Sequence, residues 1–225
     1  MAHLFGVAGP RPDGPGSTLM VLALGLGVGG VLLALFGLSV IGAALGLRLP
    51  GLVPALDPAV PGSLPELWGA AQLALAAAAA AAAMGRRASA LRLTALPLVL
   101  LLADGTDLAA HLASRFASSE GGHWSPFAAK LVATSFLGLL VAVPGWLAWR
   151  DLQDADRSIG RGLLVGLVLG LALSAGLDLL GGSVVSPAAL HLLAMAEECV
   201  ELTLYSSVAA LVIGRVAETG RLVSL

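Results

Sequence analysis

The chain has 225 residues and a formal net charge of −2, and 58% of its residues are hydrophobic while only 12% are charged. A soluble domain usually carries about 25% charged residues, so this composition excludes an ordinary soluble domain. It predicts an integral membrane protein whose first partner is the lipid bilayer. The near-neutral charge gives no reason to expect a nucleic-acid partner, and the single cysteine, Cys199, excludes an intrachain disulfide.

Six stretches are long and apolar enough to cross a bilayer, for which a helix needs about 20 residues. In chain order they cover residues 17–47, 65–84, 91–114, 126–149, 160–180 and 187–214. We therefore expect an all-α fold, a polytopic bundle of six transmembrane helices over residues 17–214, with tails over 1–16 and 215–225. The proline-rich segment 48–66 is expected to be a non-helical loop on the outer face.

Basic residues are distributed unevenly between the two ends of these stretches. One side of the predicted membrane carries nine arginines, namely Arg11, Arg86, Arg87, Arg92, Arg150, Arg157, Arg161, Arg215 and Arg221. The other side carries Arg48, Arg115 and Lys130. Because cytoplasmic loops hold an excess of lysine and arginine, both termini are predicted to lie in the cytoplasm.

Eight ionisable side chains fall inside the predicted third, fifth and sixth spans, with no lysine or arginine at the same depth. They are Asp104, Asp107, His111, Asp178, His191, Glu197, Glu198 and Glu201. An ionised carboxylate at the centre of a bilayer costs about 2.5–3.5 kcal/mol on insertion scales. The sequence therefore predicts that protons or a bound cation compensate these charges.

Helical spacing gathers most of these groups on common faces. At 3.6 residues per turn, the polar groups of the third span fall within a sector of about 80°; they are Asp104, Asp107, His111 and Ser114. A similar face of the sixth span consists of His191, Glu198, Glu201 and Tyr205, with Glu197 at its edge. Ser174 and Asp178 share a face of the fifth span. The predicted depths agree, so we expect these groups to form one intramembrane site.

Carboxylates and imidazoles together are the ligands of zinc, manganese and non-haem iron, and helical bundles build such sites from inward-facing side chains. The residues expected to bind a divalent metal ion first are Asp107, His111, His191 and Glu198. Further ligands, or groups that orient them, are expected in Asp104, Asp178, Glu197 and Glu201. The hydroxyls of Ser114, Ser174 and Tyr205 are expected beside the ligands as hydrogen-bonding neighbours.

A weak internal symmetry accompanies this pattern. The spacing of Asp104, Asp107 and His111 is repeated by Glu198, Glu201 and Tyr205 on the sixth span. Two halves of three spans each run in opposite senses through a membrane, and inverted repeats of this kind build many transporters. The sequence thus allows a 3+3 inverted repeat with the site at its interface.

Three functions are compatible with these residues. The first is cation transport or proton-coupled transport, in which the site binds a divalent metal ion or protons. The second is a membrane enzyme in which a metal activates water against a lipid-like substrate, with Glu197 or Asp104 as general base. The third is a small subunit of a larger complex that binds haem or chlorophyll through His111 and His191. The alternative without a ligand is that protonated polar groups only hold helices together.

Glycines recur at four-residue spacing within the predicted spans, as at Gly162, Gly166 and Gly170. Small residues at this spacing let helix backbones approach closely. They predict tight packing within the chain, within a homo-oligomer or against a partner in a membrane complex.

Overall fold

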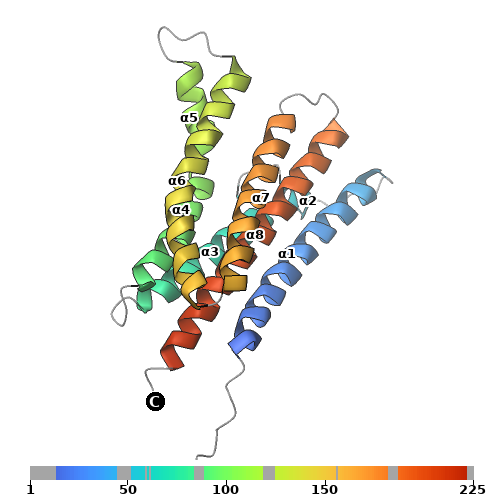
Figure 1. Ribbon diagram of the computed structural model, residues 1–225. Helices are drawn as coiled ribbons and strands as arrows, with labels where there is room; N and C mark the ends of the chain where they lie inside the picture. Colours follow the sequence, from blue (N-terminus) through green and yellow to red (C-terminus); the bar gives the residue numbers. More distant parts are fainter. Residues whose placement is uncertain are drawn as a thin grey trace, which may run out of the picture.

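The structure, a computed structural model, describes residues 14–44, 52–58, 60, 62–83, 89–118, 125–155, 157–181 and 187–221. In these ranges the chain forms eight helices and no strand (Figure 1). The all-α prediction is confirmed for the described part of the chain. The ends of both predicted tails and most of the connecting segments lie outside it.

The eight helices follow the apolar stretches of the sequence. They are α1 Gly14–Ala44, α2 Leu52–Leu56, α3 Leu64–Ala82, α4 Ser89–Gly105, α5 Leu108–Ala117, α6 Pro126–Ala155, α7 Arg157–Gly181 and α8 Pro187–Arg221. Local signals explain several boundaries. The Ser125 hydroxyl accepts a hydrogen bond from the Ala128 N–H at 3.2 Å, which caps the start of α6, and α6 and α8 both begin at a proline.

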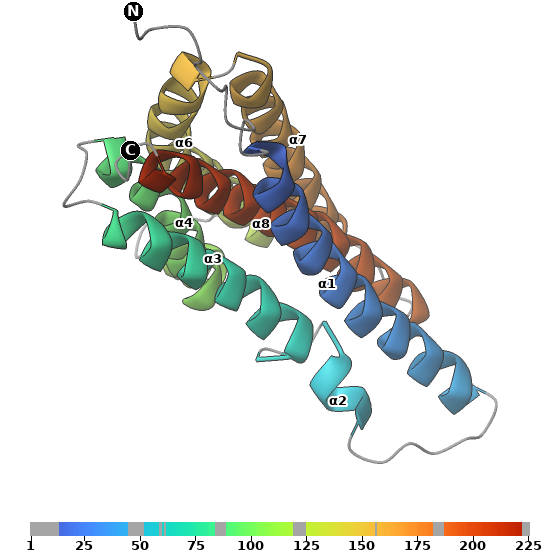
Figure 2. The same ribbon diagram turned by 90° about the horizontal axis from the view of Figure 1, so that it is seen from below.

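Helix α8 lies at the centre of the molecule, with α1, α3 and α7 packed along it (Figures 1 and 2). The contacts along α8 fix the directions of its neighbours. Gly25 of α1 meets Ser206 and Gly29 meets Leu202, so α1 and α8 are antiparallel. Gly170 of α7 meets Leu204, and Ser174 bonds to Glu201, so α7 is antiparallel as well.

Helix α3 runs parallel to α8, because Gly69 meets the Tyr205 ring and Gln72 lies one turn further on, beside Ser206. The two helices contribute to one buried apolar core together with α4, α6 and α7, and this core includes Leu73, Leu96, Val141, Leu167 and Val208. In lipid, helices associate through close packing more than through the hydrophobic effect. The buried alanines of α3 supply that close packing.

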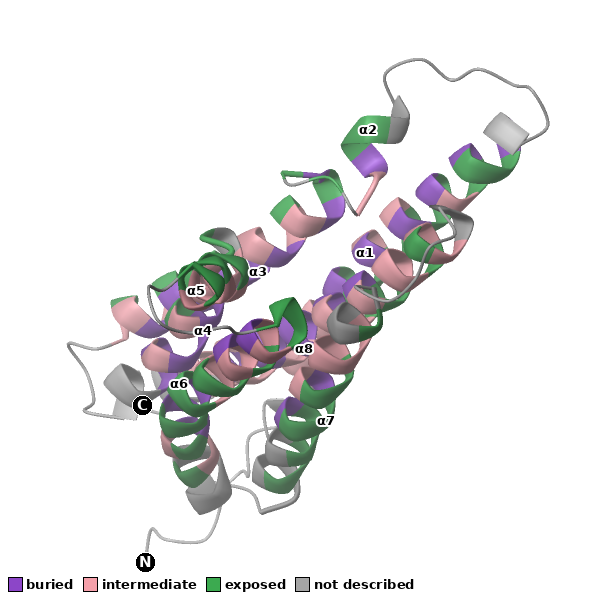
Figure 3. Cartoon of the chain, turned by 90° about the horizontal axis from the view of Figure 1, so that it is seen from above, coloured by how far each residue is buried: buried purple, intermediate pink, exposed green. Residues whose placement is uncertain are grey.

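Much of the helical surface is apolar. Large side chains on α1, α6 and α7 stand exposed, among them Met20, Val31, Leu139 and Val168, each at least 59% exposed (Figure 3). Three helical segments are long and apolar enough to cross a membrane: Thr18–Gly42, Pro126–Arg150 and Ala189–Ala217. A fourth span results if the bent pair Leu93–Asp104 and Leu108–Ala117 crosses as one. The described helices therefore support a membrane protein, and the predicted number of six spans stays a prediction.

The predicted third span is not one uninterrupted helix, contrary to the expectation from its spacing. Helix α4 ends at Gly105, α5 begins at Leu108, and the two are bent by 55°. Asp107, between them, has left-handed backbone angles, φ 45° and ψ 47°. Aspartate tolerates this conformation better than most residues because its short polar side chain bonds locally. The run of aspartates, glycine and threonine thus favours a break over a continuous helix.

The segment between the first two spans also differs from its prediction as a non-helical loop, because residues 52–56 form the short helix α2. Pro54 is tolerated there since it lies in the first turn, where the backbone N–H has no partner within the helix.

Candidate functional site

The polar side chains of α8 face two neighbouring helices, α7 and α4. Glu198 and Tyr205 are buried, each 7% exposed, and Glu201 is half-buried. The Ser174 hydroxyl of α7 donates a hydrogen bond to Glu201 Oε1 at 2.8 Å. The predicted association of Ser174 with the acidic face of α8 is therefore observed.

Two further carboxylates join this face from α4 and α3. The Asp104 carboxylate, near the end of α4, is hydrogen-bonded with the Tyr205 hydroxyl. The charge of Glu66, in the first turn of α3, acts on both Asp104 and Glu198. We call the group formed by Glu66, Asp104, Glu197, Glu198 and Glu201 the carboxylate cluster. Four helices position it, because Ser174 of α7 fixes one of its members.

The electrostatic character of the cluster is repulsive. The charged groups that act most strongly on Asp104, Glu198 and Glu201 are all carboxylates. Residues 65–84, 93–114 and 162–214 contain no lysine or arginine. Each ionised carboxylate at bilayer depth costs about 2.5–3.5 kcal/mol on insertion scales. The cluster is therefore suited to hold protons or a cation that neutralises it.

The break in the predicted third span separates Asp107 and His111 from a common helical face with Asp104. Asp107 and His111 are both exposed, and His111 Nδ1 lies 3.0 Å from the Asp107 carbonyl oxygen. The Ser114 hydroxyl donates to the His111 carbonyl oxygen at 2.8 Å. These polar groups are engaged with the backbone of their own helix, so the 80° sector expected from an unbroken helix is wrong.

His191 belongs to a second polar group, near the start of α8, where that helix packs against the C-terminal part of α1. Its Nδ1 lies 3.7 Å from Asp57 Oδ1, in the segment after α2. Its ring packs edge-on against Phe36, with the two ring centroids 6.1 Å apart. The structure thus gives His191 a carboxylate partner that lies outside the predicted ligand set.

The described residues do not form the metal site that the sequence predicts. Among them, no three His, Cys, Asp or Glu side chains are grouped so as to hold a metal ion. Asp178 lies in α7, and its side chain is outside the described part of the structure. The metal assignment stays a prediction.

Sequence reasoning missed two polar residues that lie at this site or next to it: Glu66 and Gln72. Glu66 lies where the predicted outer loop meets the predicted second span, and Gln72 precedes an alanine run. Together with Gly69, Glu66 and Gln72 follow a three-residue spacing that puts them along one side of α3. That spacing is the signal in the sequence that could have identified them.

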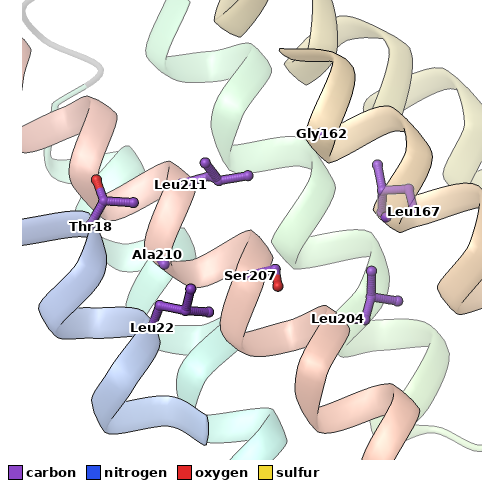
Figure 4. Close-up of a pocket in the computed structure, with 9 residues that line it drawn as sticks. Thr18, Leu22, Gly162, Leu167, Leu204, Ser207, Ala210 and Leu211 are labelled. Atoms are coloured by element: carbon purple, nitrogen blue, oxygen red, sulfur yellow. The ribbon is translucent and has the colours of Figure 1, made fainter. Parts of the chain in front are cut away.

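An apolar pocket of about 280 Å³ lies beside the site, between α1, α7 and α8 (Figure 4). Leucines and glycines line most of it, and its hydroxyls come from Thr18 and Ser207. The open space in front of Gly162 and Gly166 belongs to this pocket. The described residues of its lining include no ionisable group, so this part of the pocket is chemically distinct from the carboxylate cluster.

A comparison of the chain with protein families, curated proteins and solved structures finds no match.

Proposed function

We propose that the protein is a six-span integral membrane protein that binds protons at the carboxylate cluster and exchanges them in cation transport or proton-coupled transport. One observation carries the proposal: carboxylates of α4 and α8 act on Tyr205, and Glu66 of α3 acts on two of them, Asp104 and Glu198. All of them lie in segments without lysine or arginine. Ionisable groups inside membrane spans mark proton relays and ion pathways in pumps and transporters.

The hydroxyl partners favour the proton as the bound cation. Ser174 donates to Glu201, and Tyr205 is hydrogen-bonded with Asp104. A hydroxyl both donates and accepts hydrogen bonds, so each pair can pass a proton as well as hold one. Close carboxylates favour sharing protons, because adjacent ionised groups repel one another.

The six-span topology is supported by the helix directions. Helices α1 and α7 run antiparallel to α8, and α3 runs parallel to it. Six consecutive spans produce this alternation, with the bent pair α4 and α5 as the third. The excess of arginines then puts both termini in the cytoplasm.

The inverted repeat rests on residue spacing alone. Helix α8 is continuous, while its counterpart is interrupted between α4 and α5. The different shapes of these two helices do not favour an inverted repeat. The repeat therefore enters the proposal on residue spacing alone.

Proteoliposomes that enclose a pH-sensitive dye test the proposal. An imposed potential should drive proton entry into vesicles that contain the native protein, and Glu198→Gln should reduce the rate to that of protein-free vesicles. Asp154→Asn is the matched control, because it removes a carboxylate near the end of α6, far along the chain from the cluster. Native flux that Glu198→Gln leaves unchanged would refute the proposal.

A divalent metal is the alternative cation for the same carboxylates, since Mn²⁺ accepts carboxylate oxygens. Mass spectrometry of the purified protein distinguishes the two. A stoichiometric metal that is lost in Glu198→Gln and retained in Asp154→Asn would replace the proton with that metal.

A further inference from the structure

Two buried polar side chains lie side by side between α1, α3 and α8, next to the carboxylate cluster. Gln72 of α3 is 6% exposed and Ser206 of α8 is 0% exposed. Neither the amide oxygen and nitrogen of Gln72 nor the hydroxyl of Ser206 has a hydrogen-bond partner among the described residues. A buried polar group without a hydrogen-bond partner destabilises a protein, so the protein gains stability if a ligand bonds to both side chains.

Gly25 of α1 completes this place. A Cβ atom added at Gly25 would lie closer than 3 Å to both Gln72 Oε1 and Ser206 Oγ. Both oxygens therefore pack closely against the Gly25 backbone and occupy the space that a side chain there would need. Helix α1 is held there by the Trp68 indole, whose Nε1 donates to the Gly25 carbonyl oxygen at 3.1 Å.

We propose that Gln72 and Ser206 bind a water molecule beside Gly25, and that this water extends the proton path from the carboxylate cluster along α8. A buried water usually makes two to four hydrogen bonds to groups that otherwise lack partners. Gln72 offers both an acceptor and donors, and Ser206 offers one of each. These two side chains suit a neutral ligand that donates and accepts.

The position of this water fits a path toward one end of the bundle, and this step rests on the proposed function. Ser206 follows Glu201 by five residues, which is about 7.5 Å along a helix axis. Hydrogen bonds of about 2.8 Å can cover that separation with a short chain of water. On the predicted topology α8 runs inward, so the Gln72–Ser206 water lies on the cytoplasmic side of the cluster.

Displacing the two side chains tests the water directly. Solid-state NMR of the full chain in liposomes should show magnetisation transfer from water to the Gln72 side-chain amide. Gly25→Ala should abolish the transfer, because its methyl group would displace Gln72 Oε1 and Ser206 Oγ, the two atoms proposed to bind the water. Gly27→Ala is the matched control, since nothing lies within 4 Å of a Cβ there. A native protein without transfer, or transfer that survives Gly25→Ala, would overturn the water site.

Flux measurements test the role of the water separately. Gln72→Met keeps a similar side-chain size while removing the amide, so it provides a second variant if Gly25→Ala misfolds. In the dye-loaded vesicles, both variants should lose proton flux while Gly27→Ala retains it. Native flux in Gln72→Met would overturn the path. If the native protein carries no protons, the proposed function fails, and the NMR transfer still decides whether the water is bound.

Discussion

At the scale of single residues, the carboxylate cluster depends on hydroxyls from neighbouring helices. Ser174 is half-buried and reaches across from α7 to Glu201. A hydroxyl in this position ties two helices together and orients the carboxylate. The free energy of the contact is therefore measurable as protein stability, independently of any transport.

Ser174→Ala should lower the free energy of unfolding by about 1 kcal/mol, the usual value of one intramolecular hydrogen bond. Ser135→Ala is the control, because the exposed Ser135 hydroxyl bonds to the Leu131 carbonyl oxygen of its own helix, at 2.8 Å. Reversible unfolding in mixed micelles measures both. Equal effects of the two substitutions would show that the contact with Glu201 adds nothing.

The sequence alone predicts part of this site at residue level. Asp104, Glu198 and Glu201 are recognisable because charged side chains are rare in long apolar stretches. Glu66 is not, because it stands near the start of its helix, where acidic residues are common for reasons of the helix dipole. Its role follows from a contact between α3, α4 and α8, which single-helix periodicity cannot reveal.

At the scale of helices, the break between α4 and α5 determines which predicted ligands can meet. The spacing of Asp104, Asp107 and His111 predicts a common face only if the helix is continuous. Asp107 instead adopts left-handed angles, and α5 leaves α4 at 55°. Periodicity identified the polar residues, and the local preference of an Asp- and Gly-containing segment decided their direction.

The backbone at Asp107 makes a prediction about stability. Asp107→Val should cost about 1–2 kcal/mol, because a left-handed conformation brings Cβ too close to the backbone and a branched side chain makes this worse. Asp107→Gly should cost little, since glycine adopts positive φ freely. Ala110→Val, exposed within α5, controls for the lower helix propensity of valine. Equal stability of the three variants would contradict the left-handed assignment.

At the scale of the whole molecule, the all-α class follows from composition, whereas the number of spans does not. Hydropathy alone favours α1, α6 and α8. Helix α3 is rich in alanine, which forms helices well but is only weakly hydrophobic. Whether such a helix crosses the membrane depends on its packing against α8 as well as on its own composition.

Four single-cysteine variants in a Cys199→Ala background distinguish the possible topologies. The sites are Val60→Cys, Ser118→Cys, Ser158→Cys and Ser224→Cys, and Cys199 must be removed because it is exposed. With six spans and a cytoplasmic N-terminus, a membrane-impermeant maleimide should label the first two on intact cells. The other two should react only after permeabilisation.

Fewer spans give different patterns, because each missing crossing reverses every later side. If only α1, α6 and α8 cross, the Ser224→Cys variant becomes accessible from outside. If α1, the α4–α5 pair, α6 and α8 cross, Ser118→Cys becomes protected and Ser158→Cys accessible. Of these three arrangements, only six crossings give labelling at positions 60 and 118 with protection at 158 and 224. In that arrangement α3, α4 and α8 all cross the bilayer, which the carboxylate cluster requires if it is to hold protons there.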